Sequence, residues 1–407
     1  MPGDTVRGRA VFSPADERMT WIIAAFSILL MIADRAVVLR RAKGVTARRL
    51  LPAVWAVDAL PFIFMGVTFV AFDDNPAEVV MASMWVCFAY MLLTAARLPL
   101  TLALLLSRRR WIWLSGGAAS AAVAGLFIYG MAVTRTDYSV RSVEIVSDRL
   151  PASFDGYRIV QVSDLHLGTM VRPQHEVKRV VEICNGLQAD MIAFCGDLVD
   201  IRYSEIAAVA PLLSRLQARD GVYSVTGNHD IGVYVRDTLS LPVEESTRRV
   251  IAAEEAMGWH VLDNATEYLR RGADSISVTG ISFARDWAER RHSPDLPTDG
   301  IGRVYDHVPQ RMFNVTLAHI PQLWDDIVAE GYGDVTLSGH VHAMQVKLPV
   351  GRRGMSPAAL RYRRWSGLYT EHGRHLNITD GVGCVFFPMR LGARPEITVI
   401  VLRSARK

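Results

Sequence analysis

The chain has 407 residues, half of them hydrophobic, and a formal net charge of +4. A charge this close to balance gives no support to nucleic-acid binding, and we expect no nucleic-acid partner. The four cysteines show no CxxC spacing, which argues against a zinc ribbon or a dithiol redox motif. The length suits two or three domains, and the long apolar runs are concentrated in residues 21–135.

Four apolar stretches in the N-terminal third are long enough to cross a bilayer, which takes about 20 residues. They cover residues 21–39, 51–72, 79–106 and 111–133. Helices of a soluble bundle show a polar stripe, and these stretches mostly lack one. We therefore predict an α-helical four-span membrane domain over residues 21–135, after a retained N-terminal tail of residues 1–20.

The charges between these stretches predict their orientation. The segment between the first and second stretch holds five basic residues and no acid, and Arg108–Arg110 separate the third from the fourth. The segment between the second and third holds three acids and no base. Basic loops remain in the cytoplasm. The fourth stretch therefore starts on the cytoplasmic side and crosses the membrane once, so everything after residue 133 is expected outside the cytoplasm.

Charged residues also fall within the second and third predicted spans. Asp58 and Arg97 lie at similar depths, and a charge inside a bilayer is costly unless a partner offsets it. We predict that they pair, as a structural contact rather than as a proton path. Asp34 and Arg35 are expected nearer an interface, where their charged ends can reach water.

From residue 136 onward, short apolar runs alternate with Gly, Pro and Asp. "YSVRSVEIV" alternates like a strand, whereas "VKRVVEICNGL" and "EIAAVAPLLSRLQA" have helical spacing. Further apolar runs end in polar residues, in "YRIVQVSDLHLG", "DMIAFCGDLVD", "GVYSVTGNHD", "FNVTLAHIP" and "DVTLSGHVHAMQ". This layout predicts an α/β domain over residues 136–407, in which sites gather beyond strand ends.

Polar side chains follow five of these apolar runs in succession. They are Asp164 and His166, then Asp197, then Asn228 with His229 and Asp230, then His319, and finally His340 with His342. Each alone has an ordinary explanation, such as a helix cap, a turn or a core histidine. Five such groups at the same topological position favour a shared site.

The residue types in this set indicate metal chemistry. Carboxylate, carboxamide and imidazole without thiolate suit divalent Mn, Fe or Zn rather than a structural zinc site. Seven ligands are too many for one ion but suit two ions about 3.5–4 Å apart that share a carboxylate. Such a pair activates a bridging water and clamps the oxygens of a displacement at phosphorus.

The motifs "SDLHLG", "GDLVD", "GNHD", "AHIP" and "SGHVH" resemble those of the calcineurin-like metallophosphoesterases, most of all their membrane-associated bacterial branch. The resemblance covers about residues 138–402 and not the predicted spans. It implies a two-sheet β-sandwich flanked by helices. It also implies roles for single residues: Asp164, His166 and His342 would hold one metal ion, Asn228, His319 and His340 the other, and Asp197 would bridge both.

In the same resemblance His229 is the catalytic residue, placed near the leaving group or the phosphoryl oxygens. There it would act as a general acid or stabilise developing charge, and Asp230 would orient it or cap a helix. One departure follows the last histidine, where the branch commonly has Gly-Gly-Gln and this chain has Ala343-Met344-Gln345. Side chains in place of bare backbone predict a narrower or more apolar substrate cleft.

The expected function is that of a phosphoesterase anchored in the bacterial inner membrane, with an extracytoplasmic catalytic domain. It would hydrolyse phosphomonoesters or phosphodiesters by attack of a metal-bridging hydroxide, and its position favours lipid-linked or cell-envelope substrates. A pyrophosphatase acting on a UDP-linked glycolipid precursor is the alternative that a cytoplasmic catalytic domain would favour. A catalytically silent membrane scaffold is the other, although the complete ligand set argues against it.

Overall fold

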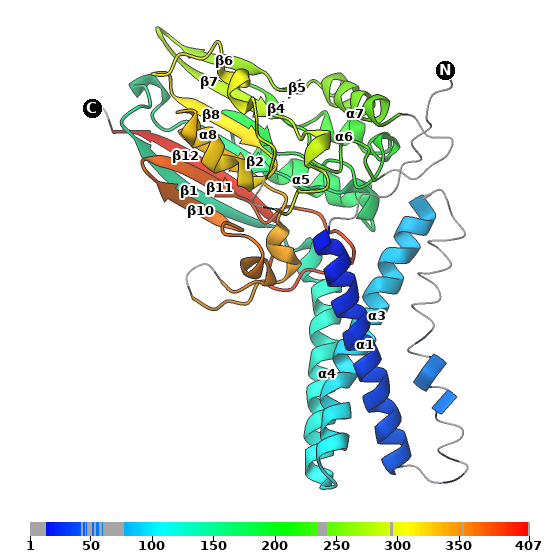
Figure 1. Cartoon of the computed structure of the whole chain (residues 1–407). Helices are drawn as coiled ribbons and strands as arrows, with labels where there is room; N and C mark the ends of the chain where they lie inside the picture. The colour runs from blue at the N-terminus through cyan, green and yellow to red at the C-terminus, as the bar shows by residue number, and fades with distance from the viewer. Residues whose placement is uncertain are drawn as a thin grey trace. The chain divides into compact units, whose positions relative to one another are not determined.

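The computed structural model describes residues 14–41, 77–234, 242–293, 296–351 and 354–405, with isolated positions between 44 and 59. The described chain forms two compact units, one with the long helices and one, from Val133 onward, with the strands (Figure 1). The helices are α1 Pro14–Arg41, α3 Ala77–Leu106, α4 Arg110–Ala132, α5 Pro173–Gly186, α6 Ala210–Leu213, α7 Val243–Ala256 and α8 Trp324–Ala329. The strands are β1 Ser139–Ser147, β2 Arg158–Val162, β3 Met191–Phe194, β4 Val222–Ser224, β5 His260–Val261, β6 Thr266–Arg271, β7 Asp274–Ile281, β8 Asn314–Ala318, β9 Val335–Ser338, β10 Gly367–Glu371, β11 Arg374–Ile378 and β12 Glu396–Ser404.

In the helical unit α3 packs against both α1 and α4 (Figure 1). Two described segments, Val79–Leu106 and Arg110–Thr136, are long and apolar enough to cross a membrane, and they coincide with the third and fourth predicted spans. The first predicted span lies within α1, of which the side chains before residue 28 are outside the described set. Most of the second span lies outside the described residues. The prediction of four spans is therefore not confirmed.

A charged contact joins α1 to α3. Arg97 Nη1 lies 3.4 Å from Asp34 Oδ2, and the hydroxyl of Thr101 donates a hydrogen bond of 2.6 Å to Asp34 Oδ1. Arg97 and Thr101 are four positions apart and so share one face of α3. The predicted partner of Arg97, Asp58, lies outside the described residues. Asp34 is buried at this contact rather than reaching water at an interface, because Arg97 and Thr101 satisfy its carboxylate.

The other unit contains two six-stranded mixed sheets. The first has the strand order β1-β12-β2-β3-β4-β5, and the second β10-β11-β9-β8-β7-β6. Strands β2 to β5 are parallel neighbours in the first sheet, as are β7, β8, β9 and β11 in the second. The carboxyl ends of parallel strands meet at one edge of a sheet, so each sheet offers an edge where loops can build a site.

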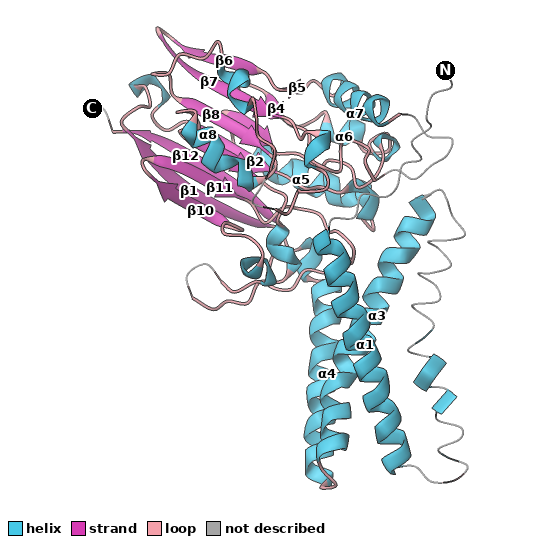
Figure 2. Cartoon of the chain, viewed as in Figure 1, coloured by secondary structure: helices cyan, strands magenta, loops and turns pink. Residues whose placement is uncertain are grey.

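Side chains on the inner faces of the two sheets form a common core. Ile159 and Met191 of the first sheet pack in one cluster with Val278, Val315 and Leu337 of the second. The outer face of the first sheet is covered by α5, α6 and α7 (Figure 2), and α8 lies on the outer side of the second, through Trp324. Strands buried on both faces have no polar face, which explains their continuous apolar runs. The predicted two-sheet α/β architecture is confirmed.

One predicted helix is much shorter than its pattern suggested. In "EIAAVAPLLSRLQA", residues 205–218, only α6 is an α-helix, and a 3-10 turn, Tyr203–Glu205, ends at its first residue. Pro211 has no N–H to donate and its ring clashes with the carbonyl four residues earlier, so a helix cannot run through it. It instead occupies the first turn of α6, where a proline is tolerated.

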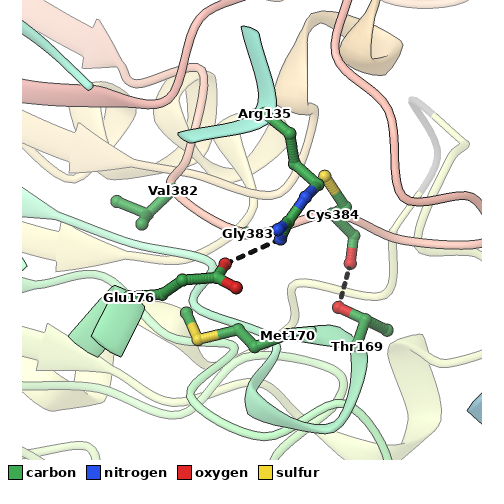
Figure 3. A pocket seen from close by; sticks show the side chains of 7 residues that line it. All are labelled: Arg135, Thr169, Met170, Glu176, Val382, Gly383 and Cys384. Atoms are coloured by element: carbon green, nitrogen blue, oxygen red, sulfur yellow. Dashed lines mark hydrogen bonds and ion pairs between the residues drawn. The ribbon is translucent and has the colours of Figure 1, made fainter. Parts of the chain in front are cut away.

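A buried ion pair fastens the start of the strand-containing unit (Figure 3). Arg135 Nη1 lies 2.7 Å from Glu176 Oε2 of α5, and Glu176 also accepts a hydrogen bond from the backbone N–H of Arg172. Beside this pair, the hydroxyl of Thr169 donates to the carbonyls of Cys384 and His166. Separating a buried pair is costly, so these contacts fix the backbone next to His166.

Candidate metal centre

The seven residues predicted as metal ligands lie together beyond the carboxyl ends of parallel strands. Asp164 and His166 follow β2, Asp197 follows β3, Asn228 follows β4, His319 follows β8, and His340 and His342 follow β9. All seven are buried, none more than 8% exposed. Residues spread over much of the chain thus form one polar group where the edges of both sheets meet.

Their ligand atoms form two groups that share Asp197. One consists of Asp164, His166, Asp197 and His342, and the other of Asp197, His319 and His340. In each group the ligand atoms lie within 4.8 Å of one another. Asn228 adjoins the second group, because its Oδ1 lies 3.2 Å from His319 Nε2. This partition matches the two ligand sets that the resemblance implied.

Hydrogen bonds on the far side of the imidazole rings determine which nitrogen faces the centre. His319 Nδ1 lies 2.7 Å from the carbonyl oxygen of Cys195, and His340 Nε2 lies 3.2 Å from that of Arg291. A carbonyl only accepts, so these nitrogens carry the protons. When the rings are neutral, the lone pairs are therefore on His319 Nε2 and His340 Nδ1. Partners of this kind orient metal-binding histidines in proteins.

The carboxylates hold negative charge at the centre. Burial alone would raise the pKa of Asp197, but the positive charge and hydrogen bond of His319 outweigh it, and the pKa is well below its usual range. Burial likewise opposes ionisation of Asp164, and His342 and His319 lower its pKa nonetheless. Burial would lower the pKa of His319, but Asp197, with Oδ2 at 3.0 Å, raises it to about 9. Metal binding at His319 must therefore release a proton.

These residues are chemically suited to hold divalent cations. His166 Nε2 and His342 Nε2 face each other at 3.2 Å, and His342 Nε2 lies 3.1 Å from Asp164 Oδ1. Burial and the neighbouring His292 and His319 keep the pKa of His340 well below its normal value, so its ring is neutral, as a ligand must be. Imidazole and carboxylate atoms directed at a common point form a suitable donor set for Mn, Fe or Zn.

His229, the predicted catalytic residue, lies against this centre. Its ring packs edge-on to that of His166, with centroids 4.6 Å apart, and its Nδ1 donates to the backbone carbonyl of Asp200. Burial lowers the pKa of His229, so its imidazole is neutral near pH 7. The Asp200 side chain also lies 3.3 Å from His166 Nδ1. Asp200 ends the "GDLVD" motif but was not among the predicted site residues.

Asp230 does not orient His229. Its carboxylate accepts hydrogen bonds from the backbone N–H groups of Asp197, Leu198, Val199 and Gly227. It thereby ties the loop after β3 to the loop after β4. Gly227 is required there, because a Cβ at this position would lie 2.1 Å from Asp197 Oδ1. The expected orienting role is wrong because four backbone donors already occupy the carboxylate.

The backbone of the centre is strained. Asp164, His166, Asp197, His340 and His342 all have positive φ, a conformation that costs a non-glycine residue about 1–3 kcal/mol. Ala343 and Met344 follow with φ of 48° and 47°. These are the positions where the family commonly has glycine, and glycine adopts this conformation without a steric penalty. The strained turn directs His340 and His342 into different ligand groups.

Several contributors to the centre could not be recognised in the sequence. Tyr234 Oη accepts a hydrogen bond from Asn228 Nδ2 at 3.0 Å, and its ring packs on His229. The ring of His292 stacks on that of His340, with centroids 5.2 Å apart, and His292 Nδ1 is hydrogen-bonded to Tyr362. Tyr234 lies six residues beyond Asn228 in the loop after β4, and His292 lies in the segment between β7 and β8. Neither comes directly after a strand, and tertiary packing brings them to the site.

Comparisons with known proteins agree with this geometry. Residues 157–344, which include all seven converging residues, match the calcineurin-like phosphoesterase family. The chain is 29% identical over 306 residues to YkuE, an uncharacterized metallophosphoesterase of Bacillus subtilis, in a match that covers 74% of this chain and 98% of that protein. YkoQ of the same organism, also an uncharacterized metallophosphoesterase, is 27% identical over 277 residues, or 67% of this chain and 93% of that protein.

A relative from Danio rerio, a transmembrane protein with a metallophosphoesterase domain, is 31% identical over 291 residues. That match covers 69% of this chain and 61% of the fish protein. Together with the two apolar helices, this relative points to membrane association of the chain. From the family match, the relatives and the converging residues we conclude that the chain belongs to the calcineurin-like metallophosphoesterases and is a metal-dependent phosphoesterase.

Proposed function

We propose that the chain is a membrane-anchored phosphoesterase that hydrolyses phosphomonoesters or phosphodiesters with two divalent metal ions, and that its substrate is a lipid-linked or cell-envelope phosphate ester. The observation that supports the two-ion reading best is the division of the buried ligand atoms into two groups with Asp197 in common. A single-ion site would need only one of these groups. The apolar helices support a substrate at the membrane.

In this proposal Asp164, His166 and His342 hold one ion, Asn228, His319 and His340 hold the other, and Asp197 contributes to both. Two such ions, when bound, supply a water of lowered pKa and neutralise charge on the phosphoryl oxygens. Asp200 holds the ring of His229 through Nδ1, so Nε2 would first have to take up a proton before it could protonate the leaving oxygen. The backbone N–H of His229 donates to Asp197 Oδ1 and so steadies the shared carboxylate.

We further propose a location in the bacterial inner membrane with the catalytic domain outside the cytoplasm. Arg40 and Arg41 at the end of α1 donate to carbonyls of Leu104, Leu105 and Ser107 at the end of α3. The basic end of α1 therefore lies near Arg108–Arg110, at the start of α4. Clustered basic residues at one end of a helical unit favour the cytoplasmic side for that end.

The decisive experiment is a metal-dependent assay on the detergent-solubilised full chain. Phosphomonoesters, phosphodiesters and lipid phosphates would be tested with Mn²⁺, Fe²⁺ and Zn²⁺, and bound metal would be counted by elemental analysis. We expect two ions per chain and hydrolysis that Asp197→Ala abolishes together with metal binding. The control Asp155→Ala alters an exposed carboxylate away from the centre and should retain both. A wild-type protein that binds metal but cleaves none of these esters would contradict the proposal.

A further inference from the structure

Exposed apolar side chains are concentrated in two loops near the metal ligands. Among the described residues after 138, Leu360 and Phe386 are the most exposed large apolar residues, at 93% and 78%. Leu348, Val350 and Met355 are exposed as well. We call these five side chains the apolar rim. A soluble surface rarely gathers such side chains in one region unless they contact a partner or a membrane.

Three members of the apolar rim lie in a hairpin that is built onto the turn of His342. Leu348 and Met355 exchange backbone hydrogen bonds across this hairpin. Its far end returns to the turn, because the hydroxyl of Ser356 donates to the carbonyl of Ala343, the residue after His342. The hairpin is therefore fixed beside the proposed metal ligands.

Leu360 is held beside the same centre. It ends a short 3-10 helix, and Tyr362, two residues later, is buried. Tyr362 is hydrogen-bonded to His292, whose ring stacks on that of the proposed ligand His340. The segment is thus anchored at the centre while Leu360 itself remains exposed.

Phe386 lies in a strained loop against the same turn. The backbone N–H of Val385 donates to the side chain of Gln345, three residues after His342. Phe386 has a φ of 64°, a conformation that is rare and costly for a residue other than glycine. Such strain persists only where the surrounding structure enforces it, and it is concentrated at functional positions. The loop therefore holds an aromatic side chain outward near the metal ligands.

The last apolar helical segment ends at this edge of the sheets. The segment Arg110–Thr136 is long and apolar enough to cross a membrane, and Arg135 near its end lines a small pocket with Thr169 and Cys384 (Figure 3). Thr169 is three residues after the proposed ligand His166, and Cys384 begins the loop that carries the aromatic member of the apolar rim. In the proposed function this segment crosses the membrane, which brings the bilayer surface next to the metal-bearing edge.

The chain around the apolar rim is basic. Residues 346–370 contain no acid, and their basic residues are Lys347, Arg352, Arg353, Arg361, Arg363 and Arg364. Ion pairs join members of this set to Asp325, Glu371 and Asp380, so positive charge remains in excess. Arg363 is well exposed, with 74% of its side chain accessible. Basic side chains beside exposed apolar ones are typical of surfaces that bind anionic phospholipid.

We propose that the apolar rim is a membrane-docking surface. Its side chains enter the interfacial region of a bilayer that contains anionic phospholipid, and the neighbouring arginines contact the head groups. The proposal rests on the proposed function, because it places the metal centre at the surface of the membrane that anchors the chain. A lipid phosphate ester could then present its phosphate to the centre while its acyl chains stay in the bilayer.

The test places a nitroxide spin label on single cysteines of the full chain in nanodiscs of phosphatidylcholine and phosphatidylglycerol. Leu360→Cys and Val350→Cys carry the label on the apolar rim. Its collisions with oxygen, which concentrates in lipid, are compared with those with a water-soluble nickel chelate. We expect the oxygen-to-nickel collision ratio at both positions to be at least about threefold that of the control, because interfacial side chains lie below the head groups.

The matched control is Val146→Cys, at an apolar position with 56% exposure. Val146 pairs with Arg403 of β12, beyond the contact of β12 with the first residue of the antiparallel β2. It therefore lies at the edge of the first sheet opposite the metal ligands. Every variant is made in a Cys87→Ala background, because the other three cysteines are buried. The background protein without a new cysteine is the labelling blank.

Two results would overturn the docking surface. A collision ratio at the rim positions equal to that at residue 146 would place the labels in water. Low collision rates with both reagents would show that protein covers them. In nanodiscs of phosphatidylcholine alone we expect the rim ratio to fall about threefold, and an unchanged ratio would refute the role of the arginines.

The spin-label experiment needs no substrate, so its failure is distinct from failure of the proposed function. If the labels enter the bilayer but the chain hydrolyses no ester, the proposed function fails and the docking surface stands. If the chain hydrolyses esters while the labels remain in water, the function stands and the docking surface fails.

Discussion

Tyr234 controls which way the amide of Asn228 faces. Its hydroxyl oxygen accepts a hydrogen bond from Asn228 Nδ2, so the amide oxygen is turned towards His319 and the centre. An amide that lost this bond could rotate and present its NH₂ group, which cannot bind a cation. A single phenolic oxygen thus selects the ligand atom, although it does not itself belong to the ligand set.

Replacing Tyr234 by Phe should therefore weaken metal binding. Partners of this kind typically contribute 10–100-fold to metal affinity, and we expect about a tenfold rise in the metal concentration needed for half-maximal activity. Metal titration of activity and of bound metal measures the effect. Tyr268→Phe is the matched control, because its hydroxyl donates only to the carbonyl of His307. Equal metal titrations for both variants would contradict the orienting role.

Arg390 holds the loop that follows β11. It is fully buried, and its guanidinium donates to the carbonyls of Asp380, Gly383 and Ala393. Lysine cannot bond three separated carbonyls in this way. Arg390→Lys should lower the free energy of unfolding by about 2–4 kcal/mol, which corresponds to a melting temperature lower by roughly 5–15 °C.

The thermal melting curve of the solubilised protein measures this loss. Arg394→Lys is its control, since Arg394 makes an exposed ion pair with Asp137, and such pairs contribute about 1 kcal/mol or less. If Arg390→Lys melted with the wild type, the guanidinium would not be needed to hold the loop.

At the residue scale, the sequence predicts the location of polar side chains that come directly after an apolar run. Asp164, Asp197 and His319 belong to this class, because a strand end fixes where such a side chain lies. Tyr234 and His292 do not, since their contacts arise from loop packing that no periodicity encodes. Asp230 shows a different limit: its position was predicted, but its four backbone partners become visible only in three dimensions.

Helix α7 carries a buried acid against the first sheet. Glu254 is fully buried and accepts a hydrogen bond from the hydroxyl of Ser224, while its Oε1 has no hydrogen-bond partner among the described residues. Burial, reinforced by Asp230, raises the pKa of Glu254 well above its usual value. The folded chain therefore keeps this proton at a pH where the unfolded chain has lost it.

Stability should accordingly fall as the pH rises from the ordinary pKa of a glutamate, about 4.3, towards the raised folded value, because the folded state binds more protons in this window. Glu254→Gln removes this dependence, so its melting temperature should fall less than that of the wild type between pH 5.5 and pH 8. Glu255→Gln, at the exposed neighbouring position, should follow the wild type. Parallel falls in all three proteins would show that Glu254 is charged in the folded state.

At the element scale, strands such as β3, β8 and β9 were predictable because burial on both faces leaves continuous apolar runs. Strands such as β6 and β10, which are only partly buried, were not predicted. Helix α5 was predictable because it covers the first sheet with one apolar face. The short helical extent of the segment around α6 was not predictable. Its apolar residues reach the core from turns and from one short helix, and not from one face of a long helix. A short apolar run such as residues 206–210 is compatible with either arrangement, and Pro211 is the residue that indicates the break.

At the scale of the whole molecule, the α3–α4 pair determines on which side of the membrane the catalytic domain lies. Arg108–Arg110 are exposed between these two apolar helices. If this basic turn is cytoplasmic, α4 crosses outward and everything that follows it lies outside, however many spans come before α3. This orientation stays a prediction from the sequence, because it depends on composition and not on packing.

Reporter fusions test this orientation. Alkaline phosphatase joined after Lys407 should be active, because it folds only outside the cytoplasm, whereas the same reporter joined after Arg110 should be inactive. Reversing the charge with Arg108→Glu, Arg109→Glu and Arg110→Glu together should reduce the activity of the Lys407 fusion, and the corresponding lysine triple variant, which keeps the charge, should not. An inactive Lys407 fusion with an active Arg110 fusion would place the metal centre in the cytoplasm. There it would meet nucleotide-activated precursors, and the pyrophosphatase on a UDP-linked glycolipid would become the better assignment.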